Sequence, residues 1–326
     1  MRYLIPGFEH APGVSCGPTS VRDTLACAGL NLTEAMCFGL GAGLGFYYLQ
    51  SESGLSRTFV GRSMSLEQDA CELLGLEWRE LREPDAAQAW ERVRARLDAG
   101  APVVLTTDIK HLPYYDTQTS YNGHRIVLAG YDLARGVALV ADTERPGLQE
   151  VALEALARAR SSDAPMYGAH ENSWFELHGT ASRSLATIVP EAVRRAGARM
   201  LHDAIGFGGL AGLELFVADL PRWPSLRDFS RCAKEGFYAI EKRGTGGGCF
   251  RALFAQFLDE ARAVRPELPL ARIAHDYREL AWQWGELATA MRLASKDGAW
   301  DGVPEHAGQI LERERALASQ LAELRF

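Results

Sequence analysis

The strongest constraint on this chain is a cysteine placed where the sequence predicts the start of a helix. Pro18 follows Cys16 and suits the first turn of a helix, and a helical apolar periodicity begins at Val21. Far downstream, His124 precedes a strand-like run and Asp142 follows the next one. A nucleophile on a helix, with a histidine and an acid on neighbouring strands, is the arrangement of cysteine-dependent catalysis. Cys16, His124 and Asp142 are therefore the candidate catalytic residues.

The two downstream runs, residues 125–131 and 137–141, are predicted to form a hairpin. If its turn is centred on Leu133, His124 and Asp142 face each other, with Cβ atoms about 4.5–5.5 Å apart. The aspartate can then accept the imidazole N–H and fix its tautomer. A register slip of one residue would place the two side chains on opposite faces of the sheet.

Each component of this site also has a purely structural interpretation. Cys16 could be a small buried apolar residue, although a helix N-terminus lowers the pKa of a thiol and favours the thiolate. His124 could simply satisfy a turn carbonyl at the end of its strand. Asp132 is a competing acid, but it lies in the predicted turn, where aspartate commonly binds its own backbone. To stabilise an oxyanion we expect the main-chain N–H of Cys16, together with the side chain of His10 or Ser15.

The composition argues against several classes of function. The net charge of −7 and the lack of clustered lysine and arginine argue against nucleic-acid binding. The six cysteines form no close pair of the kind that zinc sites need, so neither a metal site nor a disulfide framework is predicted. No apolar run is long enough to span a membrane, and the N-terminal sequence has no leader-like pattern. We expect a cytoplasmic protein without a membrane partner.

The two halves of the chain differ in pattern. The first combines helix signals with strand-like runs, whereas the second is mostly helical, with an apolar stripe that begins at Phe250. Between them, residues 161–178 contain serine, proline and glycine and show no periodicity. We therefore predict an α+β fold: a domain of residues 1–165 with an antiparallel sheet, followed by a mainly α-helical domain of residues 166–326.

Several segments resemble the butirosin biosynthesis protein H family, a branch of the papain-like cysteine enzymes. The segments that carry the resemblance are CGPTS at 16–20, NLTE at 31–34, FGLGAGLGF at 38–46, HRIVLAGYD at 124–132 and ADT at 141–143. Residues 148–160 also resemble the end of that family's N-terminal domain, and residues 244–251 resemble the helical domain often attached to it. The resemblance thus implies a papain-like N-terminal domain followed by a helical one.

The resemblance also implies an activity. This activity is the transfer of an acyl group from the phosphopantetheine thioester of an acyl carrier protein to an amine, best known from antibiotic side-chain attachment. Cys16 would hold the acyl group as a thioester, His124 would move the proton, and Asp142 would orient His124. No cofactor is expected beyond the phosphopantetheine that the substrate carries. Papain-like enzymes usually have a glutamine six residues before the cysteine, where this chain has His10.

Two alternatives remain open on the same residues. A hydrolase, such as a peptidase, amidase or thioesterase, differs only in whether water reaches the acyl-enzyme. A non-catalytic binding protein on the same fold is the other alternative. Amide formation in competition with free acid would distinguish the transferase from the hydrolase, and a Cys16 that resists thiol reagents would favour the binding protein.

Three further segments are candidates for substrate contact. Gly43 lies in a run with glycine at every second position, which suits either a close approach to a substrate arm or a tightly packed turn. Arg243 and Gly246 precede a predicted helix, so this loop could hold an anion such as the pantetheine phosphate, or serve only as a connector. His111 and Tyr114, in a loop after a strand, could contact an amine acceptor or belong to an ordinary surface loop.

Overall fold

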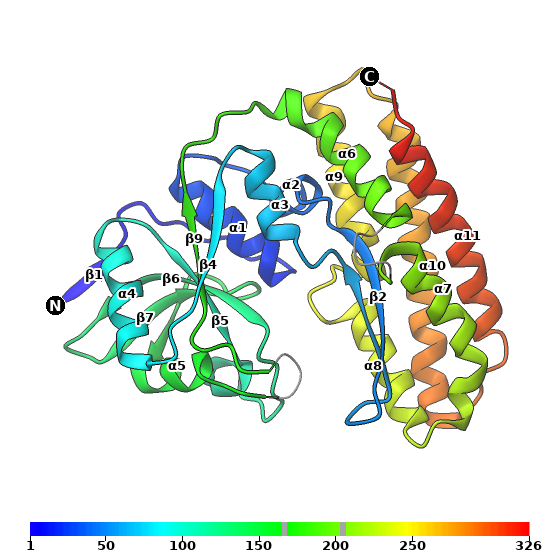
Figure 1. The fold of residues 1–326 in the computed structure, drawn as a ribbon, viewed down its shortest axis with the longest axis horizontal. Coiled ribbons are helices and arrows are strands. Elements are labelled where there is room, and N and C mark those ends of the chain that lie inside the picture. The colour runs from blue at the N-terminus through cyan, green and yellow to red at the C-terminus, as the bar shows by residue number, and fades with distance from the viewer. Residues whose placement is uncertain (165–167, 203–206, 326) are drawn as a thin grey trace. The chain divides into compact units, whose positions relative to one another are not determined.

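The computed structural model describes residues 1–164, 168–202 and 207–325, which separate into two units (Figure 1). The first unit contains Met1–Cys37 and Gly75–Ser182, and the second contains Phe38–Leu74 and Arg183–Phe326. This division differs from the consecutive domains expected from the sequence, because residues 38–74 group with the helical half. Since the β-strands within that segment pair only with each other, the strand patterns alone do not reveal this grouping.

The first unit is built on a seven-stranded antiparallel sheet. Its strand order is β4-β9-β5-β6-β7-β8, and β1 pairs with β6. The strands are β1 (Arg2–Leu4), β4 (Glu77–Leu81), β5 (Val103–Thr107), β6 (His124–Asp132), β7 (Val137–Ala141), β8 (Leu148–Ala152) and β9 (Trp174–His178). The predicted α+β class is confirmed, whereas the papain-like character of the fold stays a prediction.

Three longer helices pack on this sheet: α1 (Cys16–Cys27), α4 (Ala86–Asp98) and α5 (Leu153–Arg160). Short 3-10 turns, η1 (Ile109–His111) and η2 (Pro113–Tyr115), follow β5. The helix α1, which carries Cys16, contacts β6 and β5 (Figure 1). The apolar run in β6 is buried throughout, which explains why it lacks the alternation of a half-exposed strand.

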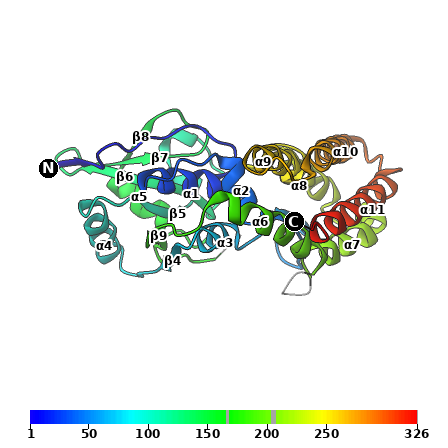
Figure 2. The ribbon, with the colours of Figure 1, turned by 90° about the horizontal axis from the view of Figure 1, so that it is seen from above.

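The second unit combines helices with a two-stranded sheet, β2 (Leu44–Gln50) and β3 (Arg57–Arg62). The helix α2 (Glu34–Leu40) leads into it. Its other helices are α3 (Leu66–Leu73), α6 (Leu185–Leu201), α7 (Gly209–Asp219), α8 (Phe229–Glu241), α9 (Arg251–Val264), α10 (Leu270–Asp297) and α11 (Val303–Ala322), with 3-10 turns at Leu220–Ser225 and Gly248–Phe250. The long helix α10 contacts α8, α9 and α11 (Figure 2). Across the described ranges, no helix has the length and apolar character needed to cross a membrane.

A buried ion pair joins three parts of the second unit. Nε of Arg251 lies 2.6 Å from Oε1 of Glu314 on α11, and both side chains are fully buried. The same guanidinium donates to the carbonyl oxygens of Gly61 on β3 at 2.7 Å and of Cys249 at 2.6 Å. The indole N–H of Trp284 donates to Glu314 at 2.9 Å. Because neither side chain is exposed to solvent, removal of one partner leaves a buried charge uncompensated.

We therefore expect Glu314→Ala to lower the free energy of unfolding by about 3–5 kcal/mol. Urea unfolding followed by tryptophan fluorescence would measure the loss. The neighbouring Arg315 provides a control, because its ion pair with Glu214 is exposed and such pairs contribute about 0–1 kcal/mol. Equal losses in Glu314→Ala and Arg315→Ala would contradict this account of the second unit.

Candidate active site

Cys16 is the first residue of α1, as the sequence predicts. The preceding Ser15 has extended backbone angles (φ −121°, ψ 124°), so the helix begins sharply at the cysteine. Val21 and Leu25 are fully buried and fix this helix in the core, whereas Cys16 is half-buried. The amide N–H groups of a first helical turn have no partner within the helix. The thiol therefore lies at the end of the helix that favours negative charge.

His124 and Asp142 are hydrogen-bonded, with Nε2 of His124 2.8 Å from Oδ1 of Asp142. The register predicted for their hairpin is nevertheless wrong. Val127 pairs with Ala141, two residues away from the predicted pairing, and the register shifts again between Leu128 and Gly130. A displacement of two residues keeps both side chains on one face of the sheet, so they meet diagonally instead of directly.

The electrostatics of the pair favour a protonated histidine. Burial alone would lower the pKa of His124, but the charge and hydrogen bond of Asp142, with a further hydrogen bond to Cys16, raise it to about 10. Burial would raise the pKa of Asp142, yet the charge and hydrogen bond of His124 and two tyrosine hydroxyls hold it below its usual value. An imidazolium next to a thiol stabilises the thiolate, so this arrangement can produce a nucleophile near neutral pH.

Two tyrosines of η2 complete the surroundings of Asp142. The hydroxyl of Tyr114 donates to Oδ2 of Asp142 at 2.7 Å, and that of Tyr115 donates to Oδ1 at 3.3 Å. The Tyr115 hydroxyl also lies 3.1 Å from Nε2 of His124. Tyr114 thus binds the acid, in contrast to the predicted contact with an amine acceptor. Tyr115 was not among the predicted site residues. The signal for it in the sequence is an adjacent pair of aromatic residues in the loop after β5, the strand that pairs with His124.

His10 does not provide the donor predicted for an oxyanion. Its Nδ1 lies 2.6 Å from Oδ2 of Asp23 on α1, and its Nε2 donates to the carbonyl oxygen of Arg145 at 3.0 Å. Both ring nitrogens are therefore occupied, and the side chain is 1 % exposed. The ring instead links the helix of Cys16 to the turn that follows Asp142, a connection with no local sequence signal.

The competing acid Asp132 is engaged in local structure, whereas the buried side chain of Ser15 stays a predicted donor for the oxyanion. The amide of Ser15 donates to Glu34 at 2.6 Å, and the amide of Val14 donates to the same carboxylate. Glu34 thus orders the segment that leads into Cys16. Asp132 accepts from the amides of residues 134 and 135, at 3.0 and 3.3 Å, which is the turn role that the sequence predicts. The first-turn amides of α1 remain as donors for an oxyanion.

The alternating glycines of residues 39–45 belong to the second unit, and each touches the protein itself. A Cβ atom built on Gly43 would lie 2.7 Å from the ring of Phe38, and one on Gly39 would overlap the ring of Phe257 at 1.9 Å. Gly41 and Gly45 are equally close to main-chain atoms, at 2.3 and 2.7 Å. The packed-turn interpretation of Gly43 therefore accounts for this run, without any substrate.

The loop predicted to hold an anion satisfies its own charges. Arg243 forms an ion pair with Glu235, and the amide of Gly248 donates to the carboxylate of Glu241 at 3.0 Å. Gly246 has a positive φ of 68°, which explains the need for glycine at this turn. A carboxylate thus already binds at this loop, which favours the connector interpretation over a phosphate site for Arg243 and Gly246.

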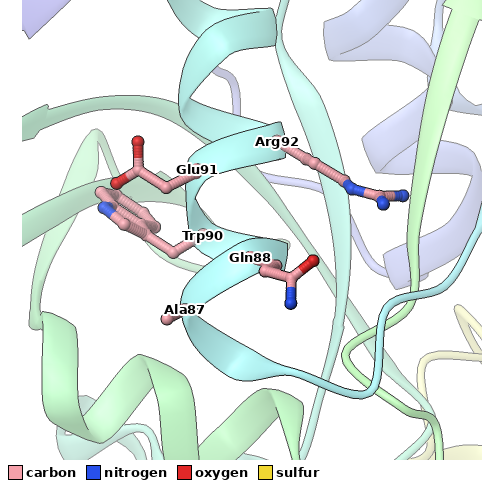
Figure 3. Close-up of a pocket in the computed structure, with 5 residues that line it drawn as sticks. All are labelled: Ala87, Gln88, Trp90, Glu91 and Arg92. Atoms are coloured by element: carbon pink, nitrogen blue, oxygen red, sulfur yellow. The ribbon is translucent and has the colours of Figure 1, made fainter.

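The remaining candidate, His111, is half-buried on η1, and its amide donates to the carbonyl oxygen of Asp108 at 3.1 Å. Elsewhere in this unit, five side chains of α4 line a hollow that includes no nucleophile (Figure 3): Ala87, Gln88, Trp90, Glu91 and Arg92. We assign no chemistry to this hollow. Within the residues that the structure describes, no cluster of three histidine, cysteine or acidic side chains is arranged to hold a metal ion.

The environment of Cys16 predicts selective alkylation. Iodoacetamide should react first at Cys16, because the imidazolium favours its thiolate, whereas burial raises the pKa of Cys27 and of Cys71. Its rate should change less than about threefold between pH 6 and 8, whereas a thiol with a pKa near 8.5 would react roughly 50- to 100-fold faster over this range. Peptide mapping after partial alkylation measures both. A steep pH dependence at Cys16 in the wild type, unchanged in His124→Ala, would contradict this account.

The His124–Asp142 pair also predicts a pH-dependent stability. The pKa of His124 rises from about 6.5 in the unfolded chain to about 10 on folding, so its contribution is complete below pH 6.5. The contribution is then lost as the pH rises through about 10. The difference in unfolding free energy between wild type and His124→Ala should therefore shrink from pH 6.5 to pH 10, as measured by urea unfolding. A constant difference would show that the pair is not charged.

Each half of the chain matches a known protein-family model. Residues 15–143 match the family model for butirosin biosynthesis protein H, N-terminal. Residues 154–321 match the model for a domain of unknown function (DUF4872). A comparison with curated proteins found no match. The first match contains the cysteine, histidine and aspartate of the site, and the second covers more than half of the chain. The chain belongs to the family defined by the DUF4872 domain, and its first half matches the N-terminal domain of butirosin biosynthesis protein H.

Proposed function

We propose that this protein is a cysteine-dependent acyltransferase of antibiotic or related biosynthesis. Cys16 takes an acyl group from the phosphopantetheine thioester of an acyl carrier protein and transfers it to a small amine. The observation that carries the proposal is the triad of Cys16, His124 and Asp142, with His124 bonded to both of the others. The match of residues 15–143 to a family model named for butirosin biosynthesis supports a biosynthetic setting.

In the first half of the reaction, the Cys16 thiolate attacks the thioester carbonyl. The first-turn amides of α1 stabilise the oxyanion of the tetrahedral intermediate. The bond from carbon to the pantetheine sulfur then breaks, and the imidazolium of His124 gives its proton to the leaving thiolate. The products are acyl-Cys16, neutral His124 and the free pantetheine thiol. Asp142 stabilises the imidazolium before the transfer and orients the ring throughout.

In the second half, the amine attacks the acyl-Cys16 carbonyl. His124, now neutral, accepts a proton from the attacking nitrogen, and the Cys16 sulfur leaves as a thiolate. The amide is released, and the thiolate–imidazolium pair is restored. A hydrolase would follow the same path with water in place of the amine, so the two activities differ in the second half only.

The proposal also assigns a compartment and a partner. All six cysteines lie in the described ranges and are thiols, as expected in a reducing cytoplasm. The carrier protein is the proposed macromolecular partner, and no resident cofactor is needed, because the reactive thioester arrives on the substrate. These assignments depend on the acyl-Cys16 intermediate, which can be observed directly.

Intact-mass spectrometry after incubation with a panel of acyl-pantetheine thioesters tests the intermediate. We expect a mass increase equal to one acyl group in the wild type and none in Cys16→Ala. His124→Ala should acylate about 100-fold more slowly or worse, because general acid–base catalysis typically contributes that much. Addition of an amine panel should convert the adduct into amide in competition with free acid.

Three outcomes would contradict the proposal. An adduct that persists in Cys16→Ala would place the acyl group elsewhere. Release of free acid alone, with every amine tested, would favour the hydrolase. Absence of both adduct and thioester turnover across the panel would favour a binding protein.

A further inference from the structure

Three groups meet at the buried acid of the site, and two of them have no part in the proton transfers above. Oδ1 of Asp142 faces Nε2 of His124 and the hydroxyl of Tyr115, while Oδ2 accepts from Tyr114. The two tyrosine rings lie 5.2 Å apart, and the ring of Tyr115 meets that of His124 edge-on at 5.5 Å. The side chain of Asp142 is 0 % exposed, so these protein groups take the place of water.

We infer that Tyr114 and Tyr115 are positioning residues that clamp Asp142 and thereby keep the proton of neutral His124 on Nε2. This inference deepens the proposed function, because it concerns the same site. It rests on the geometry of two hydroxyl donors, one on each carboxylate oxygen, which leaves the carboxylate little freedom to rotate.

The hydroxyl of Tyr115 has a second contact that bears on the tautomer. It donates to Asp142 and can accept from Nε2 of His124, which lies 3.1 Å away. Nε2 therefore faces two acceptors, Oδ1 of Asp142 and the oxygen of Tyr115, and a proton is favoured there. The lone pair of neutral His124 then lies on Nδ1, the nitrogen that remains for Cys16. Loss of this tautomer would remove the base from the thiol.

The two tyrosines stay protonated, and a neighbouring arginine packs against their rings. Burial and the charge of Asp142 both raise their pKa values, so the hydroxyls act as neutral donors. The guanidinium of Arg145 lies over both rings, 5.7 Å from the centroid of Tyr114 and 5.1 Å from that of Tyr115. The backbone of Arg145 is fixed in turn by His10, which Asp23 holds to α1. One connected network thus links the helix of Cys16 to the clamp.

The test replaces each hydroxyl without changing the ring, in Tyr114→Phe, Tyr115→Phe and the double variant. The readout is the pH dependence of Cys16 alkylation by iodoacetamide, which needs no acyl substrate. In each single variant we expect the lower edge of the plateau, where the Cys16 thiol deprotonates, to move up by several tenths of a pH unit. In the double variant it should move up by about one unit, so that below this edge Cys16 reacts roughly tenfold more slowly than in the wild type, since one pKa unit is a tenfold change in thiolate population.

Tyr131→Phe is the matched control. Its hydroxyl donates to Asp98 at 2.6 Å, so this variant also removes a tyrosine–aspartate hydrogen bond from the same unit, at the opposite end of β6. We expect it to leave the alkylation profile of Cys16 unchanged. Circular dichroism and thermal melting would establish whether each variant is folded. If the double variant is unfolded, the alkylation profiles of the two single variants test the inference.

A folded double variant with the wild-type profile would overturn the inference, as would an equal change in Tyr131→Phe. This test can fail independently of the test of the proposed function. If the alkylation profile shifts as expected but no thioester acylates Cys16, the positioning role of the tyrosines is supported and the acyltransferase function is contradicted. If acylation occurs and the profile does not shift, the acyltransferase function is supported and the positioning role is contradicted.

Discussion

The first unit depends on the hydrogen bonds that stabilise one carboxylate with no exposed surface. Asp142 lies just past the end of β7, and burial would neutralise it if donors did not surround it. His124 comes from the neighbouring strand, and two tyrosines come from the turn after β5. Three separate segments must therefore be in place before the charge is stabilised. The geometry of the candidate site therefore requires that this part of the sheet is formed.

The second unit also contains buried charges, which different groups stabilise. Its buried charges, Arg251 and Glu314, compensate each other, and carbonyl oxygens of the β2–β3 segment accept from the guanidinium. This bonding explains why residues 38–74 belong with helices that begin more than a hundred residues later. In both units, a charge removed from water determines which distant segments must come together.

Much of the site could be predicted from sequence, and the failures have identifiable causes. The helix start at Cys16 and the strands that carry His124 and Asp142 follow from local chemistry and periodicity, which the sequence displays directly. The hairpin register does not, because the irregularity between Leu128 and Gly130 has no local signature. The partner of His10 could not be predicted either, since Asp23 and Arg145 meet it only through tertiary packing. The grouping of residues 38–74 with the helical half could not be predicted either, because it involves contacts such as that of Arg251 with Gly61, which lie 190 residues apart in sequence.

The alternating glycines of residues 39–45 have a consequence for the evolution of this protein. The space beside each α-carbon is already filled, by Phe257, Leu66, Phe38 or Arg62 in turn. At Gly39 and Gly43 a larger residue can enter only if the facing phenylalanine becomes smaller at the same time, whereas at Gly41 and Gly45 main-chain atoms exclude any side chain. Invariance of Gly41 and Gly45 among relatives would therefore record a fixed limit on volume, while Gly39 and Gly43 could change as members of a compensating pair.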